Sequence, residues 1–448
     1  MLKSIKEGIL LCFLKLASLF FSEPYDRRMT LLLYKRIAYR NRVKKVKEIN
    51  NKEILPKLRE IYQKKERKIR VLFINFMQSR WQYQSLYEAL EKDENFEPIV
   101  YVTVRNIDRR IDRKGKSRYK ENFNNSIKSF TAKNMNIVLG FDIQHNKTID
   151  IMEYNPDIVF YQEPWNMNKH FDCKRVTFGA LTMICSYGSS ISLGANEFSE
   201  IQRFFYKVFL DNIFSKEILL SHYFPDDLFE IAGQPKLDEY LKPINYDNQI
   251  WKTEGKKRVI YAPHSTCHDD SVMRYGTFDY NHDYFLQLAR EHPEVEFIFK
   301  PHPELARKLV YFGIMSQNEV EKYWQAWQEL PNAQVYEDGY YFDMFRTSDL
   351  MITDCNSFLL EYLPSGKPLI QMIRHNSVGQ NMYGKIITNG YYKAHNMDEL
   401  KQCIQEVLFD GKDTKYEVRQ EIIRHKLQQP ECGCGEFIHQ FLVKLLRD

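Results

Sequence analysis

The sequence predicts an α/β protein with two doubly wound domains that face a cleft, preceded by a helical arm. Short apolar runs alternate with amphipathic segments, which is typical of parallel strands joined by helices. The length of 448 residues exceeds one ordinary core and suits two domains plus an extension. A hydrophobic fraction of 44% beside 27% charged residues indicates packed domains and argues against disorder.

The first domain is predicted over residues 68–228. A strand is expected at 69–76 because IRVLFINF is apolar almost throughout, as in a strand that is covered on both faces. A helix is expected at 79–92, with Leu86 and Leu90 among its apolar positions. Further strands are expected at 97–103, 136–139, 156–161 and 182–186.

The second domain is predicted over residues 229–415, followed by a helical segment at 416–448 that packs back on the first domain. Neither a GxGxxG nor a P-loop pattern occurs, which argues against dinucleotide-dependent dehydrogenases and P-loop NTPases. Strands are expected at 258–262, 295–300, 334–336, 350–353 and 368–372, and helices at 284–291, 319–329, 357–363 and 397–409.

Residues 1–67 are predicted to form an arm that associates with a membrane. Residues 1–70 contain 20 Lys and Arg but only 7 Asp and Glu, a net charge of +13, whereas the remainder carries −8. The apolar run at 8–21 is shorter than the roughly 20 residues that span a bilayer, and no small-residue cleavage site follows it. Such a segment is expected to lie in the interface, with the cations after it on anionic headgroups. These cations are Arg27, Arg28, Lys35, Arg36, Arg40, Arg42, Lys44, Lys45 and Lys47.

Two other interpretations of the basic arm stay open. It could be a solvated helix that packs on the body, or a contact for nucleic acid. No nucleic-acid-binding motif accompanies the charge, so nucleic acid is not predicted as a partner. We therefore expect a peripheral protein at the cytoplasmic face of the cell membrane.

The eight cysteines show no zinc-ligand spacing, so no metal site is predicted and the thiols are expected to be reduced. Cys432 and Cys434 form the one close pair in the sequence. A solvated tail is the simplest interpretation of that pair, and a metal or redox role is the alternative.

The segment Lys300-Pro301-His302-Pro303 follows an apolar strand. Its two prolines hold His302 in an extended turn. From there the imidazole can donate to a phosphate oxygen or carry a proton, and Lys300 adds a point charge. The alternative is a rigid turn with a solvent-facing histidine.

A second cluster surrounds the strand that ends at Thr353. A helix is expected to begin at Asn356 or Ser357, where free N–H groups and the helix dipole favour an anion. Glu361 lies four residues after Ser357 on the same helical face and could hold ribose hydroxyls. The alternative is a plain helix cap with a solvated Glu361.

Together these segments resemble the CDP-glycerol glycerophosphotransferase family, the teichoic-acid-polymerase type. That family carries Lys-Pro-His-Pro and, later, a segment like Ser-Asp-x-x-Ile-Thr-Asp-x-x-Ser, which stand here at 300–303 and 348–357. The resemblance is good over residues 229–375 and loose before them. Other similar segments are Gly233-Gln234-Pro235-Lys236-x-Asp238, Tyr261-Ala262-Pro263 and Lys367-Pro368-Leu369-Ile370.

The resemblance implies a GT-B fold, with the donor nucleotide on the second domain. It also implies CDP-glycerol as the donor substrate, a polymer or lipid-linked acceptor, and no required cofactor. By the same resemblance, His302 would contact or protonate the donor phosphates. The other donor-binding residues would be Lys300, Asp354, Asn356 and Ser357 near the phosphates, and Tyr340, Asp343 and Glu361 near the nucleoside.

One departure from the family concerns the acceptor side. The nearest counterpart of the family's His-Gly-Thr segment is residues 186–190, SYGSS, which contain no histidine. The base that activates the acceptor is therefore open between Glu163, at a strand end, and His264, after Tyr261-Ala262-Pro263. Glu163 could act as a base if burial raises its pKa, and a structural hydrogen-bond acceptor is the equal alternative.

The predicted reaction is in-line attack by an acceptor hydroxyl on the β-phosphate of CDP-glycerol, with CMP leaving. It would transfer glycerol phosphate, or a related polyol phosphate, to a cell-surface polysaccharide or teichoic-acid-like acceptor at the inner membrane face. One rival is a nucleotide-sugar-dependent glycosyltransferase of capsule or surface polysaccharide synthesis on the same scaffold. The second rival is a non-catalytic, membrane-bound binding scaffold.

Overall fold

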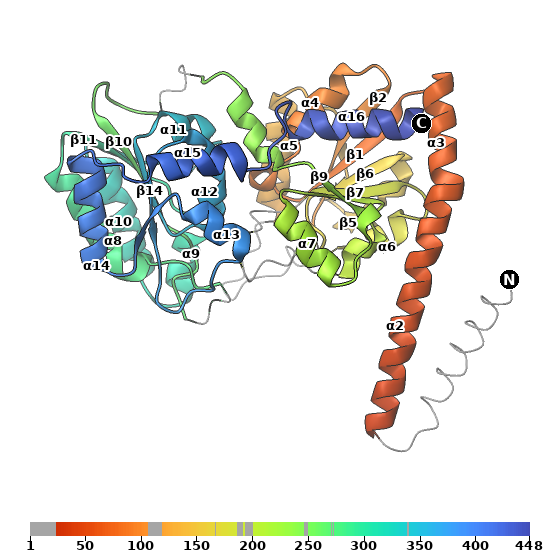
Figure 1. The fold of residues 1–448 in the computed structure, drawn as a ribbon, viewed down its shortest axis with the longest axis horizontal. Coiled ribbons are helices and arrows are strands. Elements are labelled where there is room, and N and C mark those ends of the chain that lie inside the picture. The colour runs from red at the N-terminus through yellow and green to blue at the C-terminus, as the bar shows by residue number, and fades with distance from the viewer. Residues whose placement is uncertain are drawn as a thin grey trace.

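The computed structural model describes residues 24–105, 119–165, 167–185, 191–192, 200–245, 250–269, 271, 273–337 and 340–448. These residues form two α/β domains that lie side by side (Figure 1). The predicted class, two doubly wound domains with parallel sheets, is confirmed. Two predicted features, the apolar run at 8–21 and the segment at 186–190, lie outside the described residues.

The first domain is built on a seven-stranded parallel sheet with the order β3-β2-β1-β6-β7-β8-β9. Its central strand, β1 (Ile69–Asn75), is buried at every position except Arg70, which explains why its sequence is an almost continuous apolar run. The other strands are β2 (Phe96–Val102), β3 (Ile137–Leu139), β6 (Ile158–Tyr161), β7 (Leu181–Cys185), β8 (Lys207–Leu210) and β9 (Phe229–Ile231).

The second domain is built on a six-stranded parallel sheet with the order β12-β11-β10-β13-β14-β15. Counted from β10, this is the strand order 3-2-1-4-5-6 of a dinucleotide-binding fold, in which the order reverses beside the first strand. The strands are β10 (Lys257–Ala262), β11 (Val295–Phe299), β12 (Ala333–Val335), β13 (Leu350–Thr353), β14 (Leu369–Met372) and β15 (Tyr392–Ala394).

Helices cover both sheets. The helix predicted at 79–92 begins only at Gln84, because residues 78–80 form a 3-10 turn and the chain is extended at Trp81. The first domain has α2 (Pro24–Ile49), α3 (Leu55–Lys64), α4 (Gln84–Lys92), α5 (Tyr119–Ala132), α6 (Cys173–Val176) and α7 (Ile213–Ser221). The second has α8 (Phe278–Glu291), α9 (Leu305–Tyr311), α10 (Gln317–Glu329), α11 (Phe342–Thr347), α12 (Asn356–Glu361), α13 (Met382–Thr388), α14 (Met397–Ile404) and α15 (Tyr416–His425), and the chain ends with α16 (Cys434–Arg447).

Aromatic side chains fill much of both cores. In the second domain, the ring of Phe299 lies between Tyr261, at a centroid distance of 5.7 Å, and Trp327, at 5.3 Å. In the first, Phe73 stacks on Phe160 at 5.3 Å. The high aromatic content of the chain therefore stabilises the two cores by burial and stacking.

The structure revises two predicted assignments, those of residues 229–231 and of part of residues 416–448. β9, predicted as the start of the second domain, pairs with β8 and extends the first sheet. Three residues give no periodicity that would assign a strand to one sheet or the other, and Phe229 decides it by packing in the first-domain core. The predicted 416–448 segment divides: α15 packs on the second domain, whereas α16 lies beside α3 and α4 of the first (Figure 1).

Asp238 ties together the two segments of chain that cross between the domains. It lies in the 3-10 turn Pro235–Leu241 and is 4% exposed. Its carboxylate accepts hydrogen bonds from the N–H groups of Cys434 at 2.7 Å and Gly435 at 2.8 Å, and from Gln429 Nε2 at 2.7 Å. Asp238 therefore caps the start of α16 and fixes the returning chain against the outgoing one.

The domains are also joined at α13. The N–H group of Asn381 donates to the carbonyl oxygen of Ile191, a residue of the loop after β7 that is buried in the second-domain core. A Cβ atom at Gly384 would come within 2.1 Å of that carbonyl oxygen, so only glycine permits this approach. The first domain is thus docked on the second through its own backbone.

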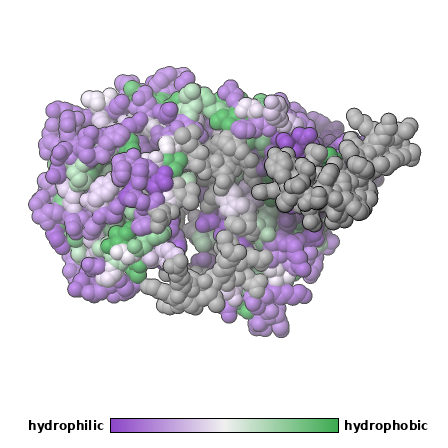
Figure 2. Space-filling view, turned by 90° about the horizontal axis from the view of Figure 1, so that it is seen from below, coloured by the Kyte–Doolittle hydropathy of each residue, from purple (hydrophilic) through white to green (hydrophobic). Residues whose placement is uncertain are grey.

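Helix α2 runs along the first domain and extends beyond it (Figure 1). Its second half packs on the domain: the ring of Tyr39 lies 5.0 Å from that of Phe204, Val46 is buried, and Arg42 donates to the carbonyl of Lys174. No helix in the described parts of the chain is long and apolar enough to cross a membrane. Seen from below, the described surface is mainly hydrophilic, with scattered hydrophobic side chains (Figure 2).

Replacing Asp238 with Ala should lower the free energy of unfolding by about 1 kcal/mol or more, because the buried N–H groups at the start of α16 lose their acceptor. Urea denaturation followed by circular dichroism measures this change. Gln440→Ala is the matched control, since Gln440 is exposed on the same helix. Equal midpoints for the two variants would contradict the capping role of Asp238.

Candidate active site

Three candidate residues of the second domain follow three neighbouring strands. β10 lies between β11 and β13, and Tyr261 in β10 is in register with Phe299 and Ile352. Because the strands are parallel, their carboxyl ends share one edge of the sheet. His264 follows β10, and the loops after β11 and β13 carry His302 and Asp354 to the same edge.

His264 joins the other two loops. Its backbone N–H group donates to Asp354 Oδ1 at 2.5 Å, and its ring lies edge-to-face against that of His302 at a centroid distance of 4.8 Å. Its Nδ1 lies 2.8 Å from Thr266 Oγ1. Burial, with the charges of His302 and Lys308, lowers the pKa of His264 well below its ordinary value. The ring is therefore neutral at physiological pH.

His302 is held in one tautomer. Its backbone N–H group donates to the carbonyl of Pro263 at 3.0 Å, and its Nδ1 accepts from the N–H group of Glu304 at 3.1 Å. A neutral imidazole that accepts at Nδ1 carries its proton at Nε2. Burial lowers the pKa of His302 to about 4, with smaller contributions from positive charges, including Lys308 and Arg80. His302 is therefore a neutral hydrogen-bond donor at neutral pH.

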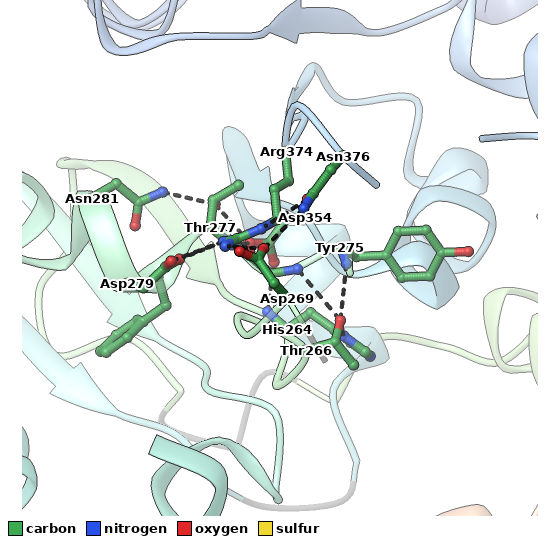
Figure 3. A network of polar contacts seen from close by, with 12 residues as sticks. His264, Thr266, Asp269, Tyr275, Thr277, Asp279, Asn281, Asp354, Arg374 and Asn376 are labelled. Carbon is green, nitrogen blue, oxygen red and sulfur yellow. Dashed lines mark hydrogen bonds and ion pairs between the residues drawn. The ribbon is translucent and has the colours of Figure 1, made fainter. Parts of the chain in front are cut away.

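Asp354 is a buried acceptor at the centre of a polar network (Figure 3). Besides the N–H group of His264, its carboxylate accepts from the N–H group of Thr277 at 2.5 Å and from the Thr277 hydroxyl at 2.7 Å. Burial raises the pKa of Asp354 to about 7, although these hydrogen bonds act in the opposite direction. The structure thus places Asp354 behind the other candidates, where it holds the loop after β10 against β13.

Arg374 extends this network from the strand end of β14 (Figure 3). Its Nη1 lies 2.8 and 2.9 Å from the two carboxylate oxygens of Asp279, and its Nη2 lies 3.1 Å from Asp269. Asn376 also donates to Asp269, at 2.9 Å. These contacts fix the long loop after β10 at both ends. Sequence reasoning did not identify them, because the partners lie about a hundred residues apart and form no local motif.

Asn356 and Ser357 form the first turn of α12, as the sequence predicted. Both are partly buried. The N-cap residue is Cys355, and no side chain caps the helix. The N–H group of Cys355 donates instead to Thr353 Oγ1 at 2.9 Å. The alternative in which Asn356 or Ser357 is itself the N-cap is therefore not what the structure shows.

Lys300 and Glu361 belong to a second, more buried cluster. Lys300 Nζ lies 5.0 Å from the ring centre of Tyr336 and 5.1 Å from that of Tyr341. Glu361 is 1% exposed, accepts a hydrogen bond from the hydroxyl of Tyr341, and lies 3.4 Å from Lys236 Nζ. Glu361 is therefore engaged by protein donors and is not the solvated residue of the alternative interpretation.

The remaining candidates near the expected nucleoside position are Tyr340 and Asp343. Asp343 is buried and forms an ion pair with Arg346. Tyr340 is 40% exposed, and its carbonyl oxygen accepts from the Tyr336 hydroxyl at 2.5 Å. In this structure Asp343 supports α11, whereas Tyr340 offers an accessible ring.

On the first domain, Glu163 is fully buried. It lies 3.3 Å from Arg80 Nη1 and also forms an ion pair with Arg105, whose guanidinium stands 5.3 Å from the ring centre of Phe76. The carboxylate therefore forms ion pairs with two cations, an arrangement that favours its charged form. Neither arginine was identified from the sequence, although each follows a strand end, a position that could have drawn attention to it.

No group of three or more His, Cys, Asp or Glu side chains in the described regions is arranged to hold a metal ion. Cys432 is exposed, Cys434 is buried at the start of α16, and both are free thiols. The structure gives Cys434 a packing role in the first-domain core.

Residues 188–376 match the family described as CDP-Glycerol:Poly(glycerophosphate) glycerophosphotransferase. The matched range includes His264, His302, Asp354 and Ser357, so the resemblance seen in the motifs is confirmed. No curated protein sequence matches the chain.

Solved structures share the fold at low identity. The wall teichoic acid polymerase TagF is 12% identical, with 92% of this chain and 98% of that chain covered and a TM-score of 0.53. UDP-GlcNAc 2-epimerase from Neisseria meningitidis is 13% identical, with coverages of 84% and 100% and a TM-score of 0.52. The MnaA protein of S. aureus is 15% identical, with coverages of 85% and 98% and a TM-score of 0.56. These likenesses establish the fold.

The two Rossmann-like sheets and the family match lead to one conclusion. The chain is a transferase of the GT-B fold that resembles the CDP-glycerol glycerophosphotransferases.

Proposed function

We propose that the chain transfers glycerol phosphate, or a related polyol phosphate, from CDP-glycerol to a cell-surface polysaccharide or teichoic-acid-like acceptor. The observation that carries this proposal is the contact of His264 with both Asp354 and His302. It lies where the strand order of the second sheet reverses, between β10 and β13. Doubly wound sheets bind their ligands outside the carboxyl ends of the strands at this point.

In the proposed donor complex, His302 donates its Nε2 proton in a hydrogen bond to an oxygen of the diphosphate. Asn356 and Ser357 bind the same group from the first turn of α12, and Lys300 supplies positive charge from beneath. Tyr340, Asp343 and Glu361 belong to the nucleoside side of the site. An acceptor oxygen attacks the β-phosphorus, the bond from that phosphorus to the bridging oxygen breaks, and CMP leaves. Donors already in place stabilise the charge that develops.

The role of His302 predicts a difference between two variants. His302→Ala should reduce the rate of CMP release from CDP-glycerol by about 100-fold or more, because a donor to the reacting phosphate is lost. His302→Gln should retain much more activity, since its amide nitrogen can donate from near the Nε2 position. Steady-state CMP release and calorimetric titration with CDP-glycerol measure both effects. A folded Ala variant with normal turnover would remove the proposed role.

His264 is the acceptor-activating base in this proposal. Its ring is neutral and lies beside His302, whereas the Glu163 carboxylate is already paired with two arginines. In the reaction, His264 takes the proton of the acceptor hydroxyl as the new bond forms. Binding of the anionic diphosphate would favour the protonated ring and so increase its basicity.

The lowered pKa of His264 predicts the pH dependence. The ring of the free protein stays unprotonated down to well below pH 6.5, whereas Asp354, with a pKa of about 7, titrates between pH 6 and 8. In Asp354→Asn, which removes that titration, kcat/KM should vary by no more than about twofold over this range. CDP-glycerol suits this measurement because its diphosphate is a diester that does not titrate in this range. A loss of kcat/KM centred near pH 6.5 would show a base with an ordinary histidine pKa and would contradict the assignment.

A panel of donors separates the proposal from its rivals. A nucleotide-sugar-dependent glycosyltransferase is the second candidate, favoured by the likeness to solved structures that hold UDP-GlcNAc or UDP. It would turn over UDP-GlcNAc or another nucleotide sugar and leave CDP-glycerol intact. A non-catalytic scaffold would bind neither CDP nor UDP in a calorimetric titration.

The proposal places the chain at the cytoplasmic face of the cell membrane as a peripheral protein. Its support is the exposed side of α2, where five cations form no ion pair with any residue in the described ranges. Each cation near an anionic leaflet contributes about 1 kcal/mol of attraction. The five are Lys35, Arg36, Arg40, Lys44 and Lys45.

Replacing these five cations with Gln should weaken binding to vesicles rich in anionic lipid by about 100-fold or more, because several kcal/mol of attraction are lost. Co-sedimentation at physiological salt measures the change. The control carries the same substitution at five exposed lysines of the second domain and should bind like the unmodified protein. Equal binding by the two variants would exclude the α2 surface. The control lysines are Lys322, Lys385, Lys393, Lys401 and Lys426.

A further inference from the structure

The first domain carries an ion pair at the same topological position as the site of the second. In its sheet, β1 lies between β2 and β6, so the strand order reverses between β1 and β6. Arg80 lies in the loop after β1, and Glu163 lies just after β6. Their contact, at 3.3 and 3.4 Å, therefore spans the crevice in which a doubly wound sheet binds its ligand.

Glu163 and Arg105 are buried, whereas Arg80 is partly exposed. The side chain of Glu163 is 0% exposed and that of Arg105 is 7% exposed, whereas that of Arg80 is 36% exposed. Arg80 uses only Nη1 for Glu163, and its other two nitrogens donate to no residue in the described ranges.

Arg80 also lies close to the second-domain site. Its charge is among those that lower the pKa of His302, and it is the one first-domain residue among them. This contribution indicates that the Arg80 guanidinium lies within electrostatic range of the proposed diphosphate site. A planar fork of donors suits a phosphoryl group, which it can bind through two parallel hydrogen bonds.

We infer that Arg80 is a first-domain binding residue for a phosphoryl oxygen and that Glu163, with Arg105, is a positioning residue that aims it. This inference rests on the proposed function, which supplies two sources of such an oxygen. One is the β-phosphate of the donor, and the other is the terminal phosphodiester of the acceptor. In either case Arg80 would fix a phosphoryl group where donor and acceptor meet while the transfer takes place.

Two calorimetric titrations distinguish the sources. One uses CDP-glycerol, and the other uses a glycerol phosphate oligomer of defined length in the presence of CDP. Arg80→Gln should weaken the affinity for one of the two ligands by about tenfold or more, because a charge-assisted hydrogen bond is lost. The ligand whose affinity falls carries the phosphoryl oxygen that Arg80 binds. The affinity of Arg80→Lys should lie between those of the unmodified protein and Arg80→Gln, because the charge remains but the planar pair of donors is lost.

Arg70→Gln is the matched control. Arg70 is 40% exposed and pairs with Glu97 at 2.8 Å, but it lies at the opposite edge of the same sheet. The Arg70→Gln variant should bind both ligands with the affinity of the unmodified protein. Affinities of Arg80→Gln within about twofold of this control in both titrations would overturn the inference while leaving the proposed function intact.

The positioning role of Glu163 has its own readout. Glu163→Gln should weaken binding of the same ligand as Arg80→Gln does, and Glu163→Asp should retain part of that affinity. In the double variant, the losses in binding free energy of Glu163→Gln and Arg80→Gln should not add. Additive losses would show that Glu163 acts independently of Arg80 and would overturn its role.

Failure of the proposed function is separately visible. It would appear as absence of binding of CDP-glycerol and of the oligomer to the unmodified protein. The anion site is then tested with inorganic pyrophosphate, which Arg70→Gln should bind at least about tenfold more tightly than Arg80→Gln. Absence of pyrophosphate binding, or equal affinity of the two variants, would overturn the inference.

Discussion

The site depends first on the buried carboxylate of Asp354. It accepts three hydrogen bonds, from the N–H group of His264 and from the N–H and hydroxyl groups of Thr277. Burying this group is unfavourable for its charged form, which is why its pKa rises to about 7. The compensating hydrogen bonds fix the loop after β10 on β13, and that loop in turn sets the ring of His264 against His302. Without this contact the three strand ends would carry the same residues but would not hold them in one geometry.

The two domains use the same device with opposite chemistry. At the point where each strand order reverses, a buried carboxylate accepts hydrogen bonds from residues of neighbouring loops. In the second domain Asp354 accepts from the backbone N–H group of His264 and from Thr277, and in the first Glu163 pairs with two guanidinium groups. The neutral imidazole of His302 and the cationic guanidinium of Arg80 are the donors that we propose for the phosphoryl group.

The relative placement of the domains follows from contacts remote from this site. Asp238 caps α16 across the junction, and the carbonyl of Ile191 is bonded to the start of α13. These contacts join backbone to backbone or to a buried carboxylate, so they fix position more tightly than exposed ion pairs would. The segment from Gly233 to Asp238 is one of those that resemble the family, and the structure explains its residues. Gly233 adopts a φ of +77°, and Asp238 accepts hydrogen bonds that join the two segments crossing between the domains.

The sequence by itself determined the central strands and the loops after β11 and β13, because continuous apolar runs and strand-end motifs such as Lys300 to Pro303 are local signals. It did not assign β9 to its sheet, nor identify β8 and β15. Tertiary structure alone decided the partners of Glu163 and Asp354, which come from segments 58 to 90 residues away. Periodicity reports which face of an element is buried, whereas the pairing of distant polar groups is set only when the sheets bring their loops together.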